Sequence, residues 1–303
     1  IEIHFAALNR RDLWIKKGIY PGATFPAVLG SDGAGVLIDD IPDRNLSAGD
    51  VVVINPSLNW GDDPRKQGPD FQILGMPGQG TLAERITVPE ANVFPKPEAL
   101  DMEQAAALPL AGLTAYRALF TRGGLKSGER VLITGIGGGV SQFMLQFATA
   151  TGAEVWATSS DPEKIDQAKT RGARGGVLYT DEKWIKALQD AAGGFDLIVD
   201  SAAGPEFAGL PELVAPAGRI VFFGGTAGAV PELGLRPLFG KQVDLRGTLM
   251  GSPDDFESML RFVSHHSIRP VIDDVYPIDQ LNAAFDAMEE ATHTGKLVVF
   301  VKS

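Results

Sequence analysis

Apolar positions in the middle of the chain alternate between two spacings. Short apolar runs of the kind that form buried parallel strands lie at 130–134, 154–158, 196–200, 219–223 and 244–249. Between most of these runs, apolar residues recur at helical spacing, which predicts helices over 140–151, 162–171, 181–192 and 207–214. Strands that alternate with helices predict right-handed βαβ units, and therefore a doubly wound parallel sheet.

The first third of the chain shows a different pattern, in which short apolar runs end at Gly, Pro or Asp. The runs at 28–38, 50–56 and 82–88 predict strands, whereas the polar residues 55–80 show no period and predict a loop. Residues 102–120 are rich in Ala and Leu and predict a helix that is broken by Pro109 and Gly112. After Ser252 the pattern predicts a helix, a strand, a helix and a strand, over 256–265, 271–276, 278–290 and 296–301.

These changes of pattern divide the chain into two predicted domains. Residues 110–251 hold the regular alternation of strands and helices, and are expected to form the α/β domain. Residues 1–109 are expected to form a separate, mainly β domain.

Composition and charge narrow the function. The 303 residues have a formal net charge of −11 and no basic run, so nucleic acid and anionic membranes are poor candidate partners. Neither a membrane span nor an export signal is visible, and the absence of cysteine makes the cytoplasm the simplest compartment. Cys is 0 and the four histidines form no HxH or HxxxH pair, so we expect no disulfide, no cysteine-ligated zinc and no metal site.

The stretch VLITGIGGGVSQF over residues 131–143 has the order strand, glycine turn, helix that a dinucleotide fingerprint requires. Glycine lets the backbone approach a pyrophosphate, and the helix N-terminus offers free N–H groups. The alternative is a glycine-rich turn without a ligand. Ser141 stands where the last glycine of the fingerprint usually lies, and its small side chain is expected to be tolerated there. We therefore predict a cofactor turn at Gly137, Gly138, Gly139 and Val140.

The second predicted strand of the α/β domain ends in hydroxyl residues instead of the acid that is typical of NAD sites. Ser159 and Ser160 can bind a ribose 2′-phosphate, and Lys164, one turn into the next helix, can supply a cation. Asp161 and Pro162 are expected to begin that helix. This combination favours NADPH, and a polar loop without selectivity is the alternative.

The chain resembles the medium-chain dehydrogenase/reductases, in particular the zinc-free quinone oxidoreductase branch. The segments that carry the resemblance span nearly the whole chain in the family's order: NRRDLWIKKGIYP, FPAVLGSDGAGVL, GTLAERITVP, AALPLAGLTAYRAL, VLITGIGGGVSQF, GFDLIVDSAAG, GRIVFFGG and TGKLVVFV. The resemblance implies a Rossmann cofactor domain over residues 110–251 and a discontinuous GroES-like catalytic domain that consists of residues 1–109 and 252–303. Family members usually carry a β-hairpin before the strand that begins here at Ile1, so a missing N-terminal segment is expected.

The resemblance also implies the chemistry. At the positions that match the catalytic zinc ligands of the family's alcohol dehydrogenases, this chain has Asn9, Ser31 and Leu110. Zinc catalysis is therefore not expected. What the resemblance implies instead is hydride transfer from NADPH to a quinone or an α,β-unsaturated carbonyl compound, a small electrophilic acceptor. Tyr20 and Asp32 are weak candidates for the proton donor beside ordered water, and each can equally be a packed loop or turn residue.

Further cofactor contacts follow from matching positions in the family. Asn9 and Trp14 resemble the nicotinamide-side wall, Thr114 the residue near the nicotinamide, and Tyr179 the adenine-side aromatic. The remaining matches follow strand ends or the returning C-terminal segment: Ser201, Phe223, Gly224, Gly225 and Lys296.

Two other functions and one assembly stay open on the sequence. An enoyl thioester reductase would want a tyrosine acid that is not plainly assignable here, and a non-catalytic, crystallin-like protein would bind NADPH without turnover. The resemblance also implies a homodimer that pairs edge strands near 244–250.

Overall fold

The computed structural model describes residues 1–302 and divides the chain into two compact units. Unit 1 consists of Ile1–Leu113 together with the residues from Met250 onward, and unit 2 consists of Thr114–Leu249. The boundaries expected from the sequence, after residues 109 and 251, fall close to these divisions.

Unit 2 is built on a six-stranded sheet in the order β12-β11-β10-β7-β8-β9, and every pair of neighbouring strands is parallel. This is the strand order of a Rossmann fold. The chain adds strands outward from β7 in one direction and then from β10 in the other, so the switch point lies between these two parallel strands. The predicted α/β fold class is therefore confirmed. The strands are β7 (Arg130–Ile133), β8 (Glu154–Ser159), β9 (Gly175–Leu178), β10 (Phe195–Asp200), β11 (Val214–Phe222) and β12 (Asp244–Gly247).

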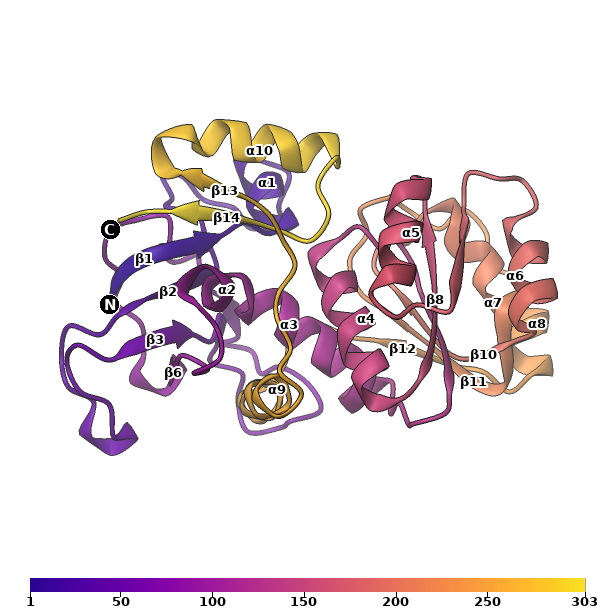
Figure 1. Ribbon diagram of the computed structural model, residues 1–303, viewed down its shortest axis with the longest axis horizontal. Helices are drawn as coiled ribbons and strands as arrows, with labels where there is room; N and C mark the ends of the chain where they lie inside the picture. The colour runs from indigo at the N-terminus through magenta and orange to yellow at the C-terminus, as the bar shows by residue number, and fades with distance from the viewer. Residues whose placement is uncertain (303) are drawn as a thin grey trace. The chain divides into compact units, whose positions relative to one another are not determined.

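Helices cover both faces of this sheet (Figure 1). On one side lie α4 (Gly139–Thr151) and α5 (Pro162–Thr170), and on the other lie α6 (Trp184–Ala192) and α7 (Leu210–Leu213). The short helix α8 (Leu235–Gly240) was not predicted. The single helix expected over 207–214 is wrong in part, because Pro205–Gly209 is a 3-10 turn and Val214 already begins β11.

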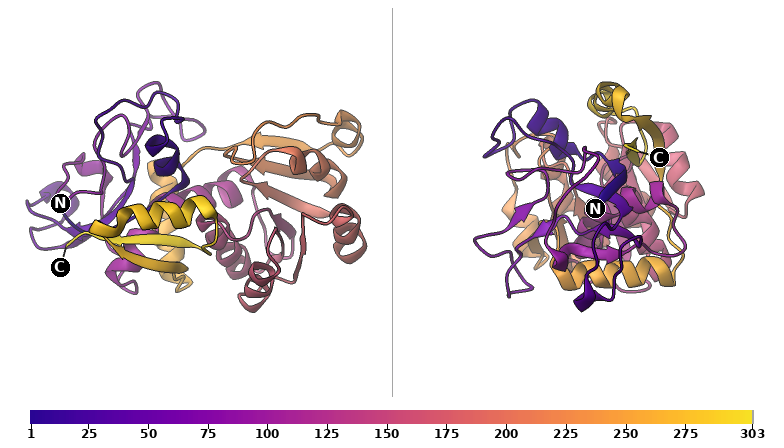
Figure 2. Two further views of the ribbon diagram at one scale, coloured as in Figure 1. Left: turned by 90° about the horizontal axis from the view of Figure 1, so that it is seen from above. Right: turned by 90° about the vertical axis from the view of Figure 1, so that its left-hand side faces the viewer.

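Unit 1 contains a second six-stranded sheet, in the order β13-β14-β1-β2-β3-β6. Its neighbours pair antiparallel except β13 and β14, which are parallel. Helix α10 (Leu281–Glu290) packs along β13 and β14, as Figure 2 shows. The strands are β1 (Glu2–Ala7), β2 (Asp32–Val36), β3 (Val51–Ile54), β6 (Val93–Pro95), β13 (Ile272–Pro277) and β14 (Lys296–Phe300).

The helices of unit 1 differ from the sequence expectation in two places. Helix α1 (Arg10–Lys16) was not predicted. The interrupted helix expected over 102–120 consists of α2 (Met102–Ala107), α3 (Pro109–Tyr116) and a π-helical segment from Arg117 to Arg122. Helix α9 (Pro253–His265) begins at the capping residue Ser252.

The strand expected over 82–88 is wrong. Only Arg85 pairs with another strand, as an isolated bridge to Glu2, although Leu82 and Ile86 donate backbone hydrogen bonds to Leu29 and Ile1. The residues 55–80, expected as a loop, contain only the two-residue strands β4 (Ser57–Leu58) and β5 (Gln72–Ile73).

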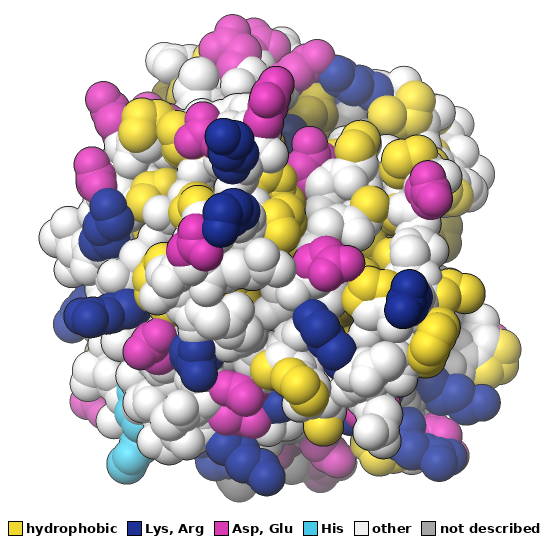
Figure 3. Space-filling view, turned by 90° about the vertical axis from the view of Figure 1, so that its right-hand side faces the viewer, with side chains coloured by type: hydrophobic (Ala, Val, Ile, Leu, Met, Phe, Trp, Pro, Cys, Tyr) yellow, Lys and Arg dark blue, Asp and Glu magenta, His cyan; other side chains and the backbone are white. Residues whose placement is uncertain are grey.

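Two surface properties concern possible partners. In the part of the chain that the structure describes, no helix is both long and apolar enough to cross a membrane. On the face drawn in Figure 3, Lys and Arg side chains are interspersed with Asp and Glu, so that face carries no continuous basic patch.

Candidate functional site

The glycine turn of unit 2 connects the carboxyl end of β7 to helix α4. Gly135 has φ +62°, a left-handed conformation that glycine adopts without strain, and Gly138 is the N-cap of α4. The turn is tied to the end of β8, because Ile136 N donates to Thr158 O at 2.9 Å and Gly135 N donates to Thr158 Oγ1 at 3.3 Å. The N–H groups in the first turn of a helix form an anion site.

Ser141 replaces the last glycine of the fingerprint without displacing the helix. Its side chain is only 1% exposed, and its hydroxyl donates to the carbonyl oxygen of Thr134 at 3.2 Å. The hydroxyl therefore ties α4 to the end of β7 in this structure instead of pointing toward a ligand.

Lys164 lies against the same turn. A Cβ atom added to Gly137 would come within 2.8 Å of Lys164 Cδ and 3.1 Å of its Nζ, so glycine at this position leaves the room that the lysine side chain fills. Helix α5 brings Lys164 there. It begins at Asp161, as expected, and the Asp161 carboxylate accepts from Glu163 N at 2.8 Å. Because the Asp161 carboxylate caps helix α5, it is already used in a hydrogen bond within the protein.

The two serines at the end of β8 differ in exposure. The Ser159 side chain is buried, and its hydroxyl accepts from Asp161 N at 3.0 Å, whereas Ser160 is exposed. The end of β8 therefore exposes the hydroxyl of Ser160 above the buried Ser159, and Lys164 lies beside the glycine turn. These residues fit a dinucleotide that carries a further phosphate.

Asp200 closes the neighbouring strand end, and sequence reasoning did not single it out. Its carboxylate accepts from Thr134 Oγ1 at 2.7 Å and from Ala203 N at 2.7 Å. Burial raises the pKa of Asp200, although these hydrogen bonds act in the opposite direction. The sequence does carry a signal for this residue, because an acid stands at the end of an apolar strand, where ligands bind in parallel sheets.

The predicted contacts Ser201, Phe223, Gly224 and Gly225 follow β10 and β11 at this edge. Phe223 N donates to Asp200 O at 3.0 Å, and a Cβ atom on Gly224 would lie 2.7 Å from Ser201 O, so the two loops touch. Tyr179 follows β9, and its backbone N donates to Ser159 O at 3.0 Å. Thr114 is buried on α3. The roles of all these residues in cofactor binding stay predictions.

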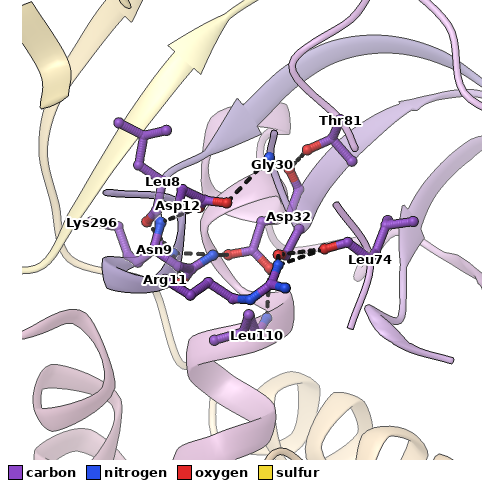
Figure 4. A network of polar contacts seen from close by, with 11 residues as sticks. Leu8, Asn9, Arg11, Asp12, Gly30, Asp32, Leu74, Thr81, Leu110 and Lys296 are labelled. Carbon is purple, nitrogen blue, oxygen red and sulfur yellow. Dashed lines mark hydrogen bonds and ion pairs between the residues drawn. The ribbon is translucent and has the colours of Figure 1, made fainter. Parts of the chain in front are cut away.

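In unit 1, strand register brings three distant residues together. Ala7 pairs with Val298 on one side and with Asp32 on the other. Asn9, two residues further on, is therefore level with Lys296, and its side chain reaches Asp32. Lys296 Nζ donates to Asp32 Oδ2 at 2.8 Å and to Asn9 Oδ1 at 2.7 Å, while Asn9 Nδ2 donates to Asp32 Oδ2 at 2.9 Å (Figure 4).

Every polar group in this cluster is used. The third bond of the Lys296 ammonium goes to Leu8 O at 2.8 Å, and Asp32 Oδ1 accepts from Leu110 N at 2.7 Å. Lys296 therefore has no ammonium proton left for a cofactor, and a carboxylate held by three donors is a poor proton source. The predicted roles of Lys296 and Asp32 in cofactor contact and proton donation stay predictions, and the observed bonds give both residues a structural role.

A second pair lies beside the cluster. Arg11 Nη1 donates to Ser31 Oγ at 2.5 Å and to Leu74 O at 2.8 Å, and the Ser31 hydroxyl donates to Leu74 O at 2.7 Å. The Arg11 guanidinium stacks over the ring of Tyr20, with its Cζ 5.0 Å from the centroid. Trp14, the other predicted contact from α1, is half-buried.

The residues at the zinc-matched positions do not fit zinc. Asn9 is engaged by Lys296 and Asp32, Ser31 is engaged by Arg11, and Leu110 has an aliphatic side chain. Two cationic side chains thus lie where a metal would need anionic or neutral donors. Within residues 1–302, no group of three or more His, Cys, Asp or Glu side chains could hold a metal ion.

A Rossmann sheet with a glycine turn before its first helix, in a chain that also carries a second, mostly antiparallel sheet, is the architecture of dinucleotide-dependent oxidoreductases. The family model described as alcohol dehydrogenase GroES-like domain matches residues 1–98, and the model described as zinc-binding dehydrogenase matches residues 139–265. The chain therefore belongs to the medium-chain dehydrogenase/reductase superfamily, and it is an oxidoreductase.

Individual relatives agree with this assignment. The zinc-type alcohol dehydrogenase-like protein YogA of Leptosphaeria maculans is 35% identical over 322 residues, covering 99% of this chain and 89% of that protein. The 2-methylene-furan-3-one reductase of Solanum lycopersicum is 32% identical over 306 residues, covering 99% of this chain and 70% of that protein. A solved NAD-dependent alcohol dehydrogenase superposes with a TM-score of 0.93 at 36% identity, covering 99% of this chain and 91% of that one.

Proposed function

We propose that this protein is an NADPH-dependent, zinc-independent reductase of quinones or α,β-unsaturated carbonyl compounds. The observation that carries the proposal is the occupation of the zinc-matched positions by the Asn9–Lys296–Asp32 cluster and the Arg11–Ser31 pair. Without a metal to activate an alcohol, the substrate must already be electrophilic. The name of the tomato relative, which reduces a methylene-furanone, supports an activated alkene as acceptor.

The cofactor would supply a hydride when bound, and the chain's own residues would hold and orient it. The first turn of α4 is suited to the pyrophosphate because its N–H groups are free of helical partners. Ser159, Ser160 and Lys164 are suited to the 2′-phosphate. NADH is the alternative cofactor, because the solved relative with a TM-score of 0.93 is an NAD-dependent alcohol dehydrogenase.

The acceptor is tested by following NADPH absorbance with purified protein and a panel of acceptors. We expect turnover of a naphthoquinone and of 2-pentenal, unchanged by a zinc chelator. Faster turnover of crotonyl thioester would favour the enoyl thioester reductase, and tight NADPH binding without any turnover would favour a non-catalytic protein. Chelator-sensitive oxidation of a simple alcohol would refute the proposal.

The cofactor is tested with Lys164→Met. A hydrogen bond between charged groups contributes about 1.5–3 kcal/mol, so the Kd for NADPH should rise about 10- to 100-fold while the Kd for NADH changes little. Lys169→Met is the matched control, since Lys169 lies on the same helix in an exposed ion pair with Asp166. Equal weakening of both cofactors by Lys164→Met would contradict a 2′-phosphate contact and favour the pyrophosphate.

The cytoplasmic location stays a prediction. So does the homodimer, which sedimentation of the purified protein tests.

A further inference from the structure

We propose that Arg11 binds the carbonyl oxygen of the acceptor and stabilises the negative charge that this oxygen gains during reduction. The inference rests on the proposed function and adds a specific residue to it. In the reaction, the β-carbon of the acceptor receives a hydride and its C=C electron pair moves to give an enolate. A proton from water then completes the saturated carbonyl compound at the α-carbon.

The hydrogen bonds of Arg11 leave one edge of its guanidinium unused. Both bonds that it makes come from Nη1, to Ser31 Oγ and Leu74 O. Its Nε and Nη2 atoms are buried and have no hydrogen-bond partner among residues 1–302, and the residue as a whole is 7% exposed. Nε–H and one Nη2–H point in parallel from the same edge, and this fork matches a carbonyl or carboxylate oxygen.

The positive charge of Arg11 is not cancelled by a direct ion pair. Its two bonded partners, a hydroxyl and a backbone carbonyl, are neutral. The adjacent acid Asp12 accepts instead from Asn9 N at 2.8 Å and from Gly30 N at 3.2 Å, and Asp32 is paired with Lys296. An oxygen that becomes negative in the transition state would therefore meet a cation that is not already neutralised at hydrogen-bonding distance.

The location of Arg11 suits this role. Its bond to Ser31 places the guanidinium at one of the positions that match zinc ligands in related enzymes, where the metal would otherwise polarise the substrate oxygen. Figure 4 shows the guanidinium directed at the backbone carbonyl of Leu74. Two bonds from Nη1 hold the plane of the guanidinium, so the guanidinium itself needs little reorganisation during the reaction.

Access to the unused edge requires movement of its cover. Tyr20 lies in a segment whose neighbours are largely exposed, since Ile19 is 67% and Phe25 is 60% exposed. Tyr20 stacks on the face of the guanidinium, and we expect the acceptor to displace this segment when it reaches the buried Nε and Nη2 atoms.

The test compares Arg11→Met and Arg11→Lys with the wild type, using 2-pentenal. Loss of one donor to an oxyanion lowers kcat by about 100-fold or more, with little change in the Kd for NADPH. Arg11→Lys should recover part of the loss, and added guanidinium chloride should partly rescue Arg11→Met, which a merely structural role would not produce. Arg44→Met is the matched control, because Arg44 is another stacked arginine of unit 1 with a buried, unpartnered Nε.

A second measurement separates this inference from the proposed function. Pentenoate, whose carboxylate stands in for the enolate oxygen, should bind the wild type at least 10-fold more tightly than Arg11→Met in calorimetry. If the wild type reduces no acceptor yet binds pentenoate through Arg11, the proposed function fails and the anion site stands. Equal pentenoate binding by both proteins, or kcat for Arg11→Met within about threefold of the wild type, would overturn the role of Arg11.

Discussion

The buried ion pair between Lys296 and Asp32 gives the sharpest test of how unit 1 is held together. Lys296 is 3% exposed and Asp32 is 0% exposed, and the ammonium donates to three oxygens at 2.7–2.8 Å. Replacing Lys296 with Met keeps an unbranched side chain that is shorter by one atom, but removes the charge and all three bonds. The change leaves the Asp32 carboxylate buried, with only Asn9 Nδ2 and Leu110 N as donors.

The size of the effect follows from this geometry. At 2.8 Å and an effective dielectric constant of about 20, the attraction between the charges is about 6 kcal/mol, most of which offsets the cost of desolvating them. Breaking a buried pair by removing one partner typically costs about 3–5 kcal/mol, because the other charge is left uncompensated. Lys296→Met should therefore destabilise unit 1 by about that amount. Adding Asp32→Asn should recover about 2 kcal/mol, since it removes the stranded charge.

Hydrogen exchange measured by mass spectrometry reports the loss of stability separately for peptides of each unit. In Lys296→Met, peptides from β1 and β14 should exchange about 100-fold faster or more, while peptides from β8 in unit 2 serve as the internal control. The double variant should exchange more slowly than the single variant. Unchanged protection of β1 and β14, or strictly additive effects of the two substitutions, would refute the account of the cluster as a coupled pair.

Two further substitutions test Asp200 and the packing of unit 1. Burial raises the folded-state pKa of Asp200 above its ordinary value of 3.8, so its stabilising contribution is complete below that value and is lost as the pH rises through the raised value. The stability of Asp200→Asn relative to the wild type should therefore increase from about pH 4 to pH 7 in urea titrations, and a difference independent of pH would contradict this. Gly35→Ala should cost about 3 kcal/mol, because its Cβ would lie 1.9 Å from the backbone oxygen of Glu2. Gly78→Ala, with nothing within 4 Å, is the control, and equal melting temperatures for the two variants would be the contrary result.

Much of the fold of unit 2 was predictable because its signals are local. The apolar runs of the central strands and the cap at Asp161 are set by neighbouring residues. Strand β9 was missed, since Gly175 and Gly176 resemble a turn. The reason for glycine at 175 is tertiary: a Cβ atom there would lie 2.6 Å from the Trp156 ring. Such a constraint is invisible in a single sequence.

The candidate site also has one part that could be predicted from the sequence and one part that could not. The glycine turn was predictable because strand, turn and helix are adjacent in the chain. The cluster in unit 1 depends on the register of three strands, which brings Asn9 and Lys296 together across 287 positions of sequence. The resemblance identified Lys296 and Asn9, but not that their polar atoms are bonded to one another. Arg11 was not singled out, because its unused donors become apparent only when its partners are known.

The two buried cations of unit 1 therefore differ in what they can do. Lys296 gives all three protons to oxygens of its own unit, one of them a carboxylate, so it is neutralised and its role is to fix β14 against β1 and β2. Arg11 bonds only neutral oxygens and keeps one edge unused. Arg11 and Lys296 contact the side chains of Ser31 and Asn9, two of the zinc-matched positions, and their positive charges oppose the binding of a metal cation there. In the proposed function, the charge of Arg11 would take the place of a bound metal. A guanidinium can stabilise an oxyanion but cannot ionise an alcohol as zinc does, so the acceptor that we propose is one that is already electrophilic.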